Sequence, residues 1–313
     1  MDDREEVPTK ASVPEKDEID AKTGAAKKAD GDGPDSAPAG QVSQLRIGED
    51  QADSNPFKQH VRRRADFKHV YNMNNPKRGL AVVISNRNFD PSTGMSERSG
   101  TEIDAIALQS RFQELGFEVQ VYKDLTVNQM FTLMKKAAAY DHSQSDCFAC
   151  AILSHGDNGI LYGKDGTIEI DRLTCHFKGD KCLTLAGKPK LFFIQACRGS
   201  SLDHGTTVTD AAGDQERIPA EADFLMAYSV VPGYFSWRNS ARGSWFVQAL
   251  NQVLQEHGTD LDMLTMMTRV NMKVAYEFES NAAKEYMNRK KQIPCIVSML
   301  TKDLYFTPKK YQQ

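Results

Sequence analysis

The sequence predicts an α/β protein with a mostly parallel central sheet of about six strands and helices on both faces. Short apolar runs alternate along the chain with segments whose apolar residues recur at helical spacing, which is typical of parallel strands joined by helical crossovers. The composition agrees, because 313 residues with 40% hydrophobic and 26% charged side chains are ordinary for one large globular domain or two small ones.

Six apolar runs, each bounded by polar residues or glycine, are the predicted strands. They lie at 80–84, 117–122, 147–153, 190–194, 224–229 and 296–300. The predicted helices carry apolar residues every three or four positions. They lie at 101–116, 127–139, 244–257 and 261–278. Residues 159–170 predict a β-hairpin, because the turn sequence Lys-Asp-Gly stands at their centre.

The first 53 residues differ in composition from the rest of the chain. They contain no Phe, Tyr or Trp, and they carry fourteen acidic and seven basic residues. Such a segment buries too little apolar surface to fold alone. We therefore expect a disordered acidic extension over residues 1–53, followed by one folded unit over 54–313.

Nothing in the sequence indicates a membrane or nucleic-acid partner. No apolar stretch approaches the ~18 residues that a membrane helix needs. The N-terminus lacks the apolar core of a secretory signal, and no basic cluster is interleaved with aromatic residues. Most of the six cysteines lie inside apolar strand-like runs, as buried reduced thiols do. We expect a cytoplasmic protein.

One long segment interrupts the alternation of strands and helices. Residues 200–217 show no periodicity, are rich in Gly, Ser, Thr and Asp, and lie between two predicted strands. A long irregular loop inside a compact domain is usually functional, and a polar loop is open to proteolysis. A plain surface insertion is the other interpretation.

Two predicted strands end next to residues with catalytic chemistry. Cys197 follows the strand at 190–194, and His155 with Gly156 follows the strand at 147–153. The carboxyl ends of parallel strands meet at one edge of a sheet, where sites form. A histidine can take the proton of a thiol and later protonate a leaving amine, and the amides of Gly156 and Cys197 are candidates for an oxyanion hole. Taken singly, Cys197 is equally well an inert core thiol and His155 a loop histidine.

Cys147 and Cys150 have the CxxC spacing found in redox and metal sites. A strand places the two side chains on opposite faces, and no second CxxC follows. The spacing of Cys175, His176 and Cys182 is too irregular to supply further zinc ligands. We therefore expect structural cysteines and no metal.

Several motifs resemble those of the caspases, cysteine endopeptidases that cleave after aspartate, and most closely those of the executioner group. The likeness extends over roughly residues 71–306 and includes Gln-Ala-Cys-Arg-Gly at 195–199. The other motifs stand in the order that the family shows: GMSERSG at 94–100, LSHG at 153–156, FFI at 192–194, IPAEADF at 218–224, VPGYFSWR at 231–238 and IPC at 293–295. The resemblance implies a caspase-like sandwich fold.

The resemblance also implies a role for each matching residue. Cys197 is the expected nucleophile, His155 the general acid and base, and Gly156 with Cys197 the amide donors to the oxyanion. Arg98, Gln195 and Arg238 are expected to line the pocket for the substrate aspartate. Two guanidinium groups suit one buried carboxylate, because their hydrogen bonds to it are charge-assisted and often bidentate. The alternative for both arginines is a surface position.

Further pockets are implied along the substrate. Phe235 and Trp237 are expected to form the next pocket, and Asn239 and Trp245 part of the pocket for the fourth residue before the cut. The chain departs from some executioner caspases in this last region. Phenylalanines found there are replaced by Asn281, Ala282 and Ala283, followed by Tyr286 and Met287. The preference at the fourth position is therefore open.

The family implies a precursor that is activated by proteolysis. Asp210, followed by alanine in the polar loop, fits the junction between a large subunit, 54–210, and a small subunit, 211–313. Asp53, at the end of Asp-Gln-Ala-Asp, fits the release of residues 1–53. Asp20, Asp35 and Asp214 are weaker candidates, because aspartate is common in polar loops.

The expected active form is a homodimer of large and small subunit pairs, with the last strand near the two-fold axis. We expect an initiator caspase as activator, protein substrates that expose aspartate-containing loops, and no cofactor. A catalytically silent homologue is an alternative, although Cys197, His155, Arg98 and Arg238 are all intact. An initiator or inflammatory caspase needs an adaptor domain that residues 1–53 do not supply. A CxxC thiol oxidoreductase conflicts with the predicted strand.

Overall fold

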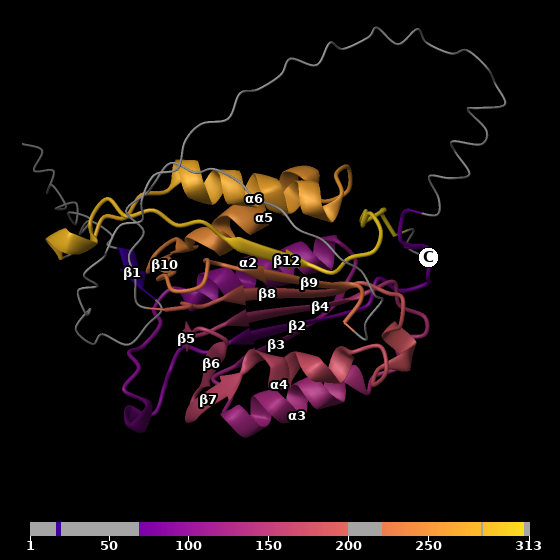
Figure 1. Cartoon of the computed structure of the whole chain (residues 1–313), viewed down its shortest axis with the longest axis horizontal. Helices are drawn as coiled ribbons and strands as arrows, with labels where there is room; N and C mark the ends of the chain where they lie inside the picture. Colours follow the sequence, from indigo (N-terminus) through magenta and orange to yellow (C-terminus); the bar gives the residue numbers. More distant parts are fainter. Residues whose placement is uncertain (1–16, 20–68, 200–220, 283, 310–313) are drawn as a thin grey trace, which may run out of the picture.

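The structure, a computed structural model, describes residues 17–19, 69–199, 221–282 and 284–309. Its centre is a six-stranded sheet in the order β12-β9-β8-β4-β2-β3 (Figure 1). Neighbouring strands are parallel, except that β12 is antiparallel to β9 at one edge. The predicted mostly parallel sheet is confirmed. Its strands are β2 (Leu80–Ser85), β3 (Glu118–Lys123), β4 (Phe148–Leu153), β8 (Lys190–Gln195), β9 (Phe224–Tyr228) and β12 (Cys295–Ser298).

Helices cover both faces of the sheet, as predicted. In Figure 1, α5 and α6 lie above the sheet and α3 and α4 lie below it. The longer helices are α2 (Thr101–Glu114), α3 (Val127–Ala138), α5 (Trp245–His257) and α6 (Met263–Glu277). The shorter ones are α4 (Ile170–Thr174), η1 (Pro91–Thr93), η2 (Cys175–Phe177), η3 (Leu183–Leu185) and η4 (Glu285–Met287).

The two helical layers bury alternate residues of the central strands on opposite faces of the sheet. In β2 every residue is buried, and Ala81 and Val83 belong to the core cluster that includes residues of α2, α5 and α6. Val82 and Ile84 belong to the cluster on the other face, with residues of α3 and α4. Because strand side chains alternate between faces, an uninterrupted apolar run is what a strand covered on both sides requires.

Two three-stranded sheets lie beside the main one. The first is ordered β5-β6-β7, with β5 (Gly156–Asp157), β6 (Ile160–Gly163) and β7 (Gly166–Glu169), and it confirms the predicted hairpin. The second is ordered β1-β10-β11, with β1 (Asp17–Ile19), β10 (Trp237–Asn239) and β11 (Gly243–Ser244).

Strand β1 is a finding that the composition of residues 1–53 did not predict. It pairs antiparallel with β10, more than 200 residues further along the chain (Figure 1). Three residues do not form a strand alone, so the regular structure at Asp17–Ile19 depends on the partner that the folded unit supplies. Apart from Asp17–Ile19, residues 1–53 lie outside the described part of the chain.

The register of the parallel strands aligns their carboxyl ends. Ser85 pairs with Leu153, and Leu153 pairs with Gln195. The residues that follow these three strands therefore leave the sheet at one edge, which is where the sequence predicts the site.

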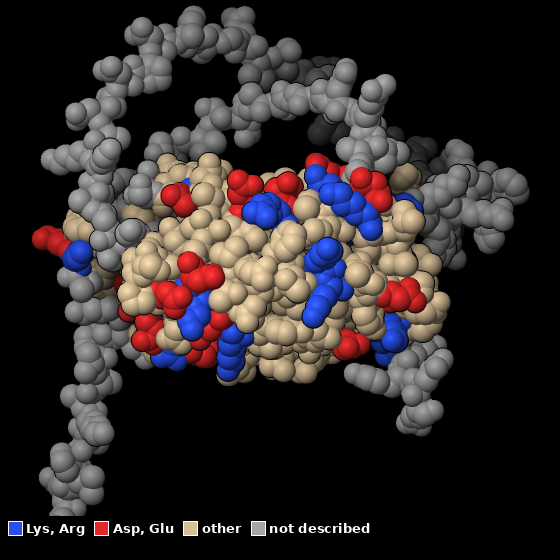
Figure 2. All heavy atoms as spheres, turned by 90° about the horizontal axis from the view of Figure 1, so that it is seen from below, with Lys and Arg blue, Asp and Glu red and all other residues tan. Residues whose placement is uncertain are grey.

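The surface in Figure 2 mixes acidic and basic side chains, with neutral residues between them. A large field of one sign is not visible on this face. Among the described residues, no helix has both the length and the apolarity to cross a membrane.

Candidate active site

Cys197 lies directly beyond the end of β8 and is buried. Its Sγ accepts a hydrogen bond from the backbone N of Ser236 at 3.1 Å. The preceding residue is fixed by the Ser229 hydroxyl, which lies 3.2 Å from Ala196 N and 2.9 Å from Ala196 O. The thiol is thus held between the end of the parallel sheet and the segment that leads into β10.

The turn after Cys197 requires glycine. Gly199 has a φ of +152°, and a Cβ at this position would meet the backbone of Gly233 at 2.3 Å. Arg198 N donates to Tyr234 O at 3.1 Å, and Gly233 N donates to Arg198 O at 2.6 Å. The sequence prediction of a cysteine at a strand-to-glycine turn is confirmed by this geometry.

His155 lies beyond the end of β4 and is fully buried. Its Nε2 is 2.8 Å from the carbonyl oxygen of Ser96, and the ring packs on Phe89 with centroids 4.8 Å apart. A carbonyl only accepts hydrogen bonds, so this contact places the proton on Nε2 and makes Nδ1 the basic nitrogen of the neutral ring.

Gly156 brings the two strand ends into contact. A Cβ on this residue would lie 2.8 Å from Ala196 Cβ and 2.9 Å from Cys197 O, closer than side chains approach. Only a residue without a side chain allows the His155 turn to pack directly on the Cys197 turn. The histidine and the cysteine therefore belong to one site, as the topology predicts.

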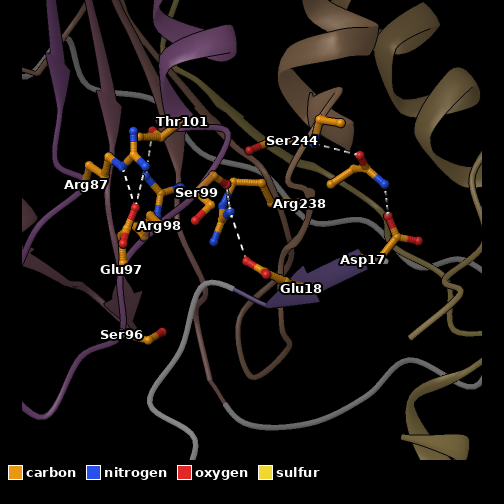
Figure 3. Close-up of polar contacts among 12 residues, drawn as sticks. Asp17, Glu18, Arg87, Ser96, Glu97, Arg98, Ser99, Thr101, Arg238 and Ser244 are labelled. Atoms are coloured by element: carbon orange, nitrogen blue, oxygen red, sulfur yellow. Dashed lines mark hydrogen bonds and ion pairs between the residues drawn. The ribbon is translucent and has the colours of Figure 1, made fainter. Parts of the chain in front are cut away.

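Arg98 and Arg238 are both buried, at 0% and 1% exposure, which rules out the surface alternative for them. Arg98 Nη1 donates to Thr101 Oγ1 at 2.9 Å and to Asn86 O at 3.3 Å. Arg238 extends from β10, and its Nη1 donates to the carbonyl oxygen of Ser99 (Figure 3). The segment 98–99 thus carries one guanidinium group and fixes the other.

Gln195 is the last residue of β8 and is also buried. Its Nε2 donates to Ser236 Oγ at 2.7 Å. Because Ser236 N also donates to Cys197 Sγ, this serine joins the predicted specificity residue to the predicted nucleophile.

Aromatic side chains stack on one another beside β10. Trp237 stacks on Trp245 with centroids 5.7 Å apart, and Trp245 stacks on Phe278 at 5.5 Å. Trp237, Trp245 and Ala282 form one buried cluster, and Ile19 of β1 packs against it. Phe235 is buried as well, and Asn239 closes β10. Ala283 lies outside the described residues.

Comparison with known proteins shows the family to which the chain belongs. The family model of the caspase domain matches residues 78–305. The chain belongs to the caspase family. It is 54% identical over 245 residues to caspase-7 of Gallus gallus, and the alignment covers 75% of this chain and 79% of that protein. It is 52% identical over 240 residues to caspase-3 of Oryctolagus cuniculus, with 75% and 86% covered.

A solved caspase shares the fold. The crystal structure of caspase-1 from Spodoptera frugiperda matches with a TM-score of 0.72 and 48% identity, and covers 77% of this chain and 96% of that one. The similarity to caspase-3 and caspase-7 makes the chain an executioner caspase of that type. It is an apoptotic cysteine endopeptidase that cleaves after aspartate, and the catalytically silent alternative is not favoured.

Some residues of the caspase site were not predicted from the sequence. Ser236 holds the thiol, and Gln292 accepts from Trp237 N at 2.7 Å and donates to Ser229 O at 2.7 Å. Ser236 has a weak local signal, because it stands between Phe235 and Trp237 in a motif already noted. Gln292 has none, because it reaches the site across 55 residues of sequence.

The sequence also singles out two cleavage positions and a CxxC pair. Asp210 and Asp53 lie outside the described residues. Cys147 and Cys150 belong to core clusters on opposite faces of the sheet, and burial raises the pKa of both thiols. In the described part of the chain no three metal-binding side chains gather. Their positions on opposite faces and their raised pKa indicate structural thiols, as the strand placement predicts.

Proposed function

We propose that Cys197 and His155 carry the peptide cleavage of this caspase. The thiol proton passes to His155 Nδ1, and the thiolate adds to the carbonyl carbon of the peptide bond after a substrate aspartate. The C–N bond breaks, the amine leaves with the proton from His155, and water hydrolyses the thioester to free Cys197. Amide groups of Gly156 and Cys197 stabilise the oxyanion.

The observation that carries this proposal is the contact between the two turns. Gly156 packs on Ala196 and Cys197 with no room for a side chain. This places the residue after the histidine against the nucleophile, so both amides can serve one oxyanion.

We propose that Arg98, Arg238 and Gln195 bind the substrate aspartate. Two buried guanidinium groups anchored by backbone carbonyls are fixed in place, so little entropy is lost when a carboxylate binds. Phe235 and Trp237 line the next pocket, and Asn239 and Trp245 the pocket for the fourth residue.

We propose that the chain is a precursor with an N-terminal extension, 1–53, a large subunit, 54–210, and a small subunit, 211–313. An initiator caspase cuts after Asp210, and a second cut after Asp53 releases the extension. The sequence supports this, because both aspartates stand at changes of composition or in a long polar loop.

We propose that the active caspase is a homodimer that cleaves proteins with exposed aspartate-containing loops. Support comes from β12, which is an edge strand of the main sheet with exposed Val297 and Ser298. Unpaired edges tend to be covered by a second chain. All six cysteines, including the proposed nucleophile, are thiols and not disulfides, which suits a reducing compartment, and we propose the cytoplasm.

The test is the intact mass of the full-length chain beside its Cys197→Ala variant. We expect cuts after Asp210 and Asp53 in the unmutated chain only, with turnover of a fluorogenic aspartyl peptide. If both remain uncut, adding an initiator caspase separates a dormant precursor from a silent homologue. A chain cut at Asp210 that still fails to cleave the peptide would contradict the proposal.

A further inference from the structure

The segment 96–99 joins the two parts of the proposed site, the histidine and the aspartate pocket. The carbonyl oxygen of Ser96 lies 2.8 Å from His155 Nε2. Arg98 is one of the two guanidinium groups that are proposed to bind the substrate aspartate. The carbonyl oxygen of the next residue accepts a hydrogen bond from the other, Arg238. A shift of this segment would therefore move the proposed catalytic histidine and the aspartate pocket together.

Neither a helix nor a strand holds this segment in place. It lies between η1 and α2, and none of its residues belongs to a strand of the described sheets. Connecting segments are on average more mobile than the helices and strands they join, so individual contacts must fix them where precision is needed. The geometry of the proposed site therefore depends on what holds the segment 96–99.

Arg87, just beyond the end of β2, binds the segment and the helix that follows it. Its Nε donates to Glu97 Oε1 at 2.6 Å, and its Nη1 donates to Glu102 Oε1 in the first turn of α2. Its backbone oxygen accepts a hydrogen bond from Arg98 N at 2.9 Å. Figure 3 shows the side chains of Arg87 and Glu97 turned toward each other, beside Arg98. One arginine thus anchors the segment at several points.

Arg87 is itself tied to the main sheet. Asp124, the residue after β3, accepts hydrogen bonds at Oδ1 from the backbone N of Arg87 at 2.7 Å and of Asn88 at 2.9 Å. Its Oδ2 accepts from Asn88 Nδ2 at 2.8 Å. The backbone N of Asp124 donates to the oxygen of Ser85, the last residue of β2, at 3.1 Å. The contacts therefore run from two strands of the sheet through Arg87 to the segment 96–99.

The exposure of these ion pairs favours a geometric role over a stabilising one. The side chains of Arg87 and Glu97 are 41% and 50% exposed, and exposed pairs contribute little to folding. A guanidinium group, however, has its donors in a fixed planar arrangement, so the carboxylates that it binds are held in defined orientations. The network is therefore suited to fix the direction of a loop.

We propose that Arg87 is a positioning residue for the cleavage reaction and acts through Glu97 and Glu102 on the segment 96–99. These contacts fix the carbonyl oxygens that orient the histidine ring and one guanidinium group of the aspartate pocket. Loss of the contacts slows the chemical step and weakens binding of the substrate aspartate at the same time. The proposal rests on the proposed function and deepens it, because it concerns the same site.

The test is steady-state kinetics of the full chain after processing, with a fluorogenic aspartyl peptide as substrate. The variants are Arg87→Ala, Glu97→Gln and the double variant, and active sites are titrated with an aspartyl fluoromethyl ketone. We expect kcat per titrated site to fall and KM to rise. Each single variant lowers kcat/KM by about tenfold, because displacement of reacting groups by about 1 Å costs up to about 100-fold. The double variant is no slower than Arg87→Ala, because both changes break the same contact.

The matched control is Glu114→Gln, which also removes a charge that is paired with an arginine, Arg111. Glu114 is 59% exposed and ends α2 just before β3 begins, at the edge of the sheet away from the site. We expect unchanged kinetics in this control. Circular dichroism of all variants checks that they are folded.

The kinetic constants separate positioning from a loss of folded enzyme. A change that only unfolds part of the enzyme reduces the number of titrated sites and leaves KM and kcat per site unchanged, and that result would overturn the inference. Constants within about twofold of the unmutated chain in both single variants, or additive losses in the double variant, would overturn it as well. Absence of turnover in the unmutated processed chain would instead contradict the proposed function.

Discussion

At the residue scale, the site depends on a glycine at the contact between two turns. Gly156 lets the turn after β4 lie against Ala196 and Cys197. Ser236 then holds the sulfur, and Ser96 O orients the histidine ring. The proposed catalytic pair, Cys197 and His155, is therefore fixed mainly by backbone atoms, which leaves little freedom for substitution at this contact.

The first prediction concerns Gly156→Ala. The new Cβ overlaps with Ala196 and Cys197, so the turns move apart and the oxyanion donors are displaced. We expect kcat/KM on an aspartyl peptide to fall by about 100-fold, the usual cost of one lost oxyanion donor. The control is Gly166→Ala in β7, where the nearest atom to a Cβ is Val127 Cγ2 at 3.8 Å. Activity within threefold of the unmutated chain would contradict the assignment.

The second prediction concerns the aspartate pocket. Arg98→Ala and Arg238→Ala each remove one proposed buried partner of the substrate carboxylate, at a cost of about 2–5 kcal/mol. We expect kcat/KM to fall by about 30-fold or more, with a folded spectrum by circular dichroism. Near-normal turnover of an aspartyl peptide by either folded variant would refute the pocket.

At the element scale, the sequence was informative wherever the signal was local. The strands that became β2, β4 and β8 were predicted because both of their faces are buried and their apolar runs are unbroken. No local pattern predicts the pairing of β1 with β10 or the position of Gln292, because both depend on contacts between residues far apart in the sequence. The same distinction separates Cys197 and His155, which strand ends predict, from the residues that hold them.

The loop between α3 and β4 gives a third prediction, on pH. His142 is fully buried, its Nε2 is 2.9 Å from Ala137 O, and burial lowers its pKa. As pH falls below about 6.5, the unfolded chain gains a proton that the folded chain resists, so stability decreases.

The measurement is the melting temperature at pH 7.5 and pH 5.5. We expect a smaller loss in His142→Gln than in the unmutated chain, because glutamine can still donate to Ala137 O but does not titrate. An equal loss in both would show that other groups cause the acid sensitivity.

At the scale of the whole molecule, two strand edges are the proposed binding surfaces. β1 pairs with β10, and β12 ends the main sheet with its outer side unpaired by described strands. One edge is thus where substrates are proposed to bind, and the other is where a second copy is proposed to pair.

The fourth prediction tests that second edge. Val297 on β12 is 41% exposed, and Val297→Glu would place like charges close together at a two-fold interface. We expect a monomer with low activity by analytical ultracentrifugation and peptide assay. Leu183→Glu, at another exposed apolar residue, should leave the dimer intact. A stable dimer of the Val297 variant would place the interface elsewhere.

The assignment of Cys197 as the nucleophile is tested by mass-spectrometric mapping of the adduct that an aspartyl fluoromethyl ketone leaves on the processed chain. We expect one adduct, on Cys197, with Cys147 and Cys150 unmodified because both thiols are buried and their pKa is raised. We also expect loss of that adduct in the Arg98→Ala variant. An active preparation labelled on a different cysteine, or inactivated without a label on Cys197, would contradict the assignment.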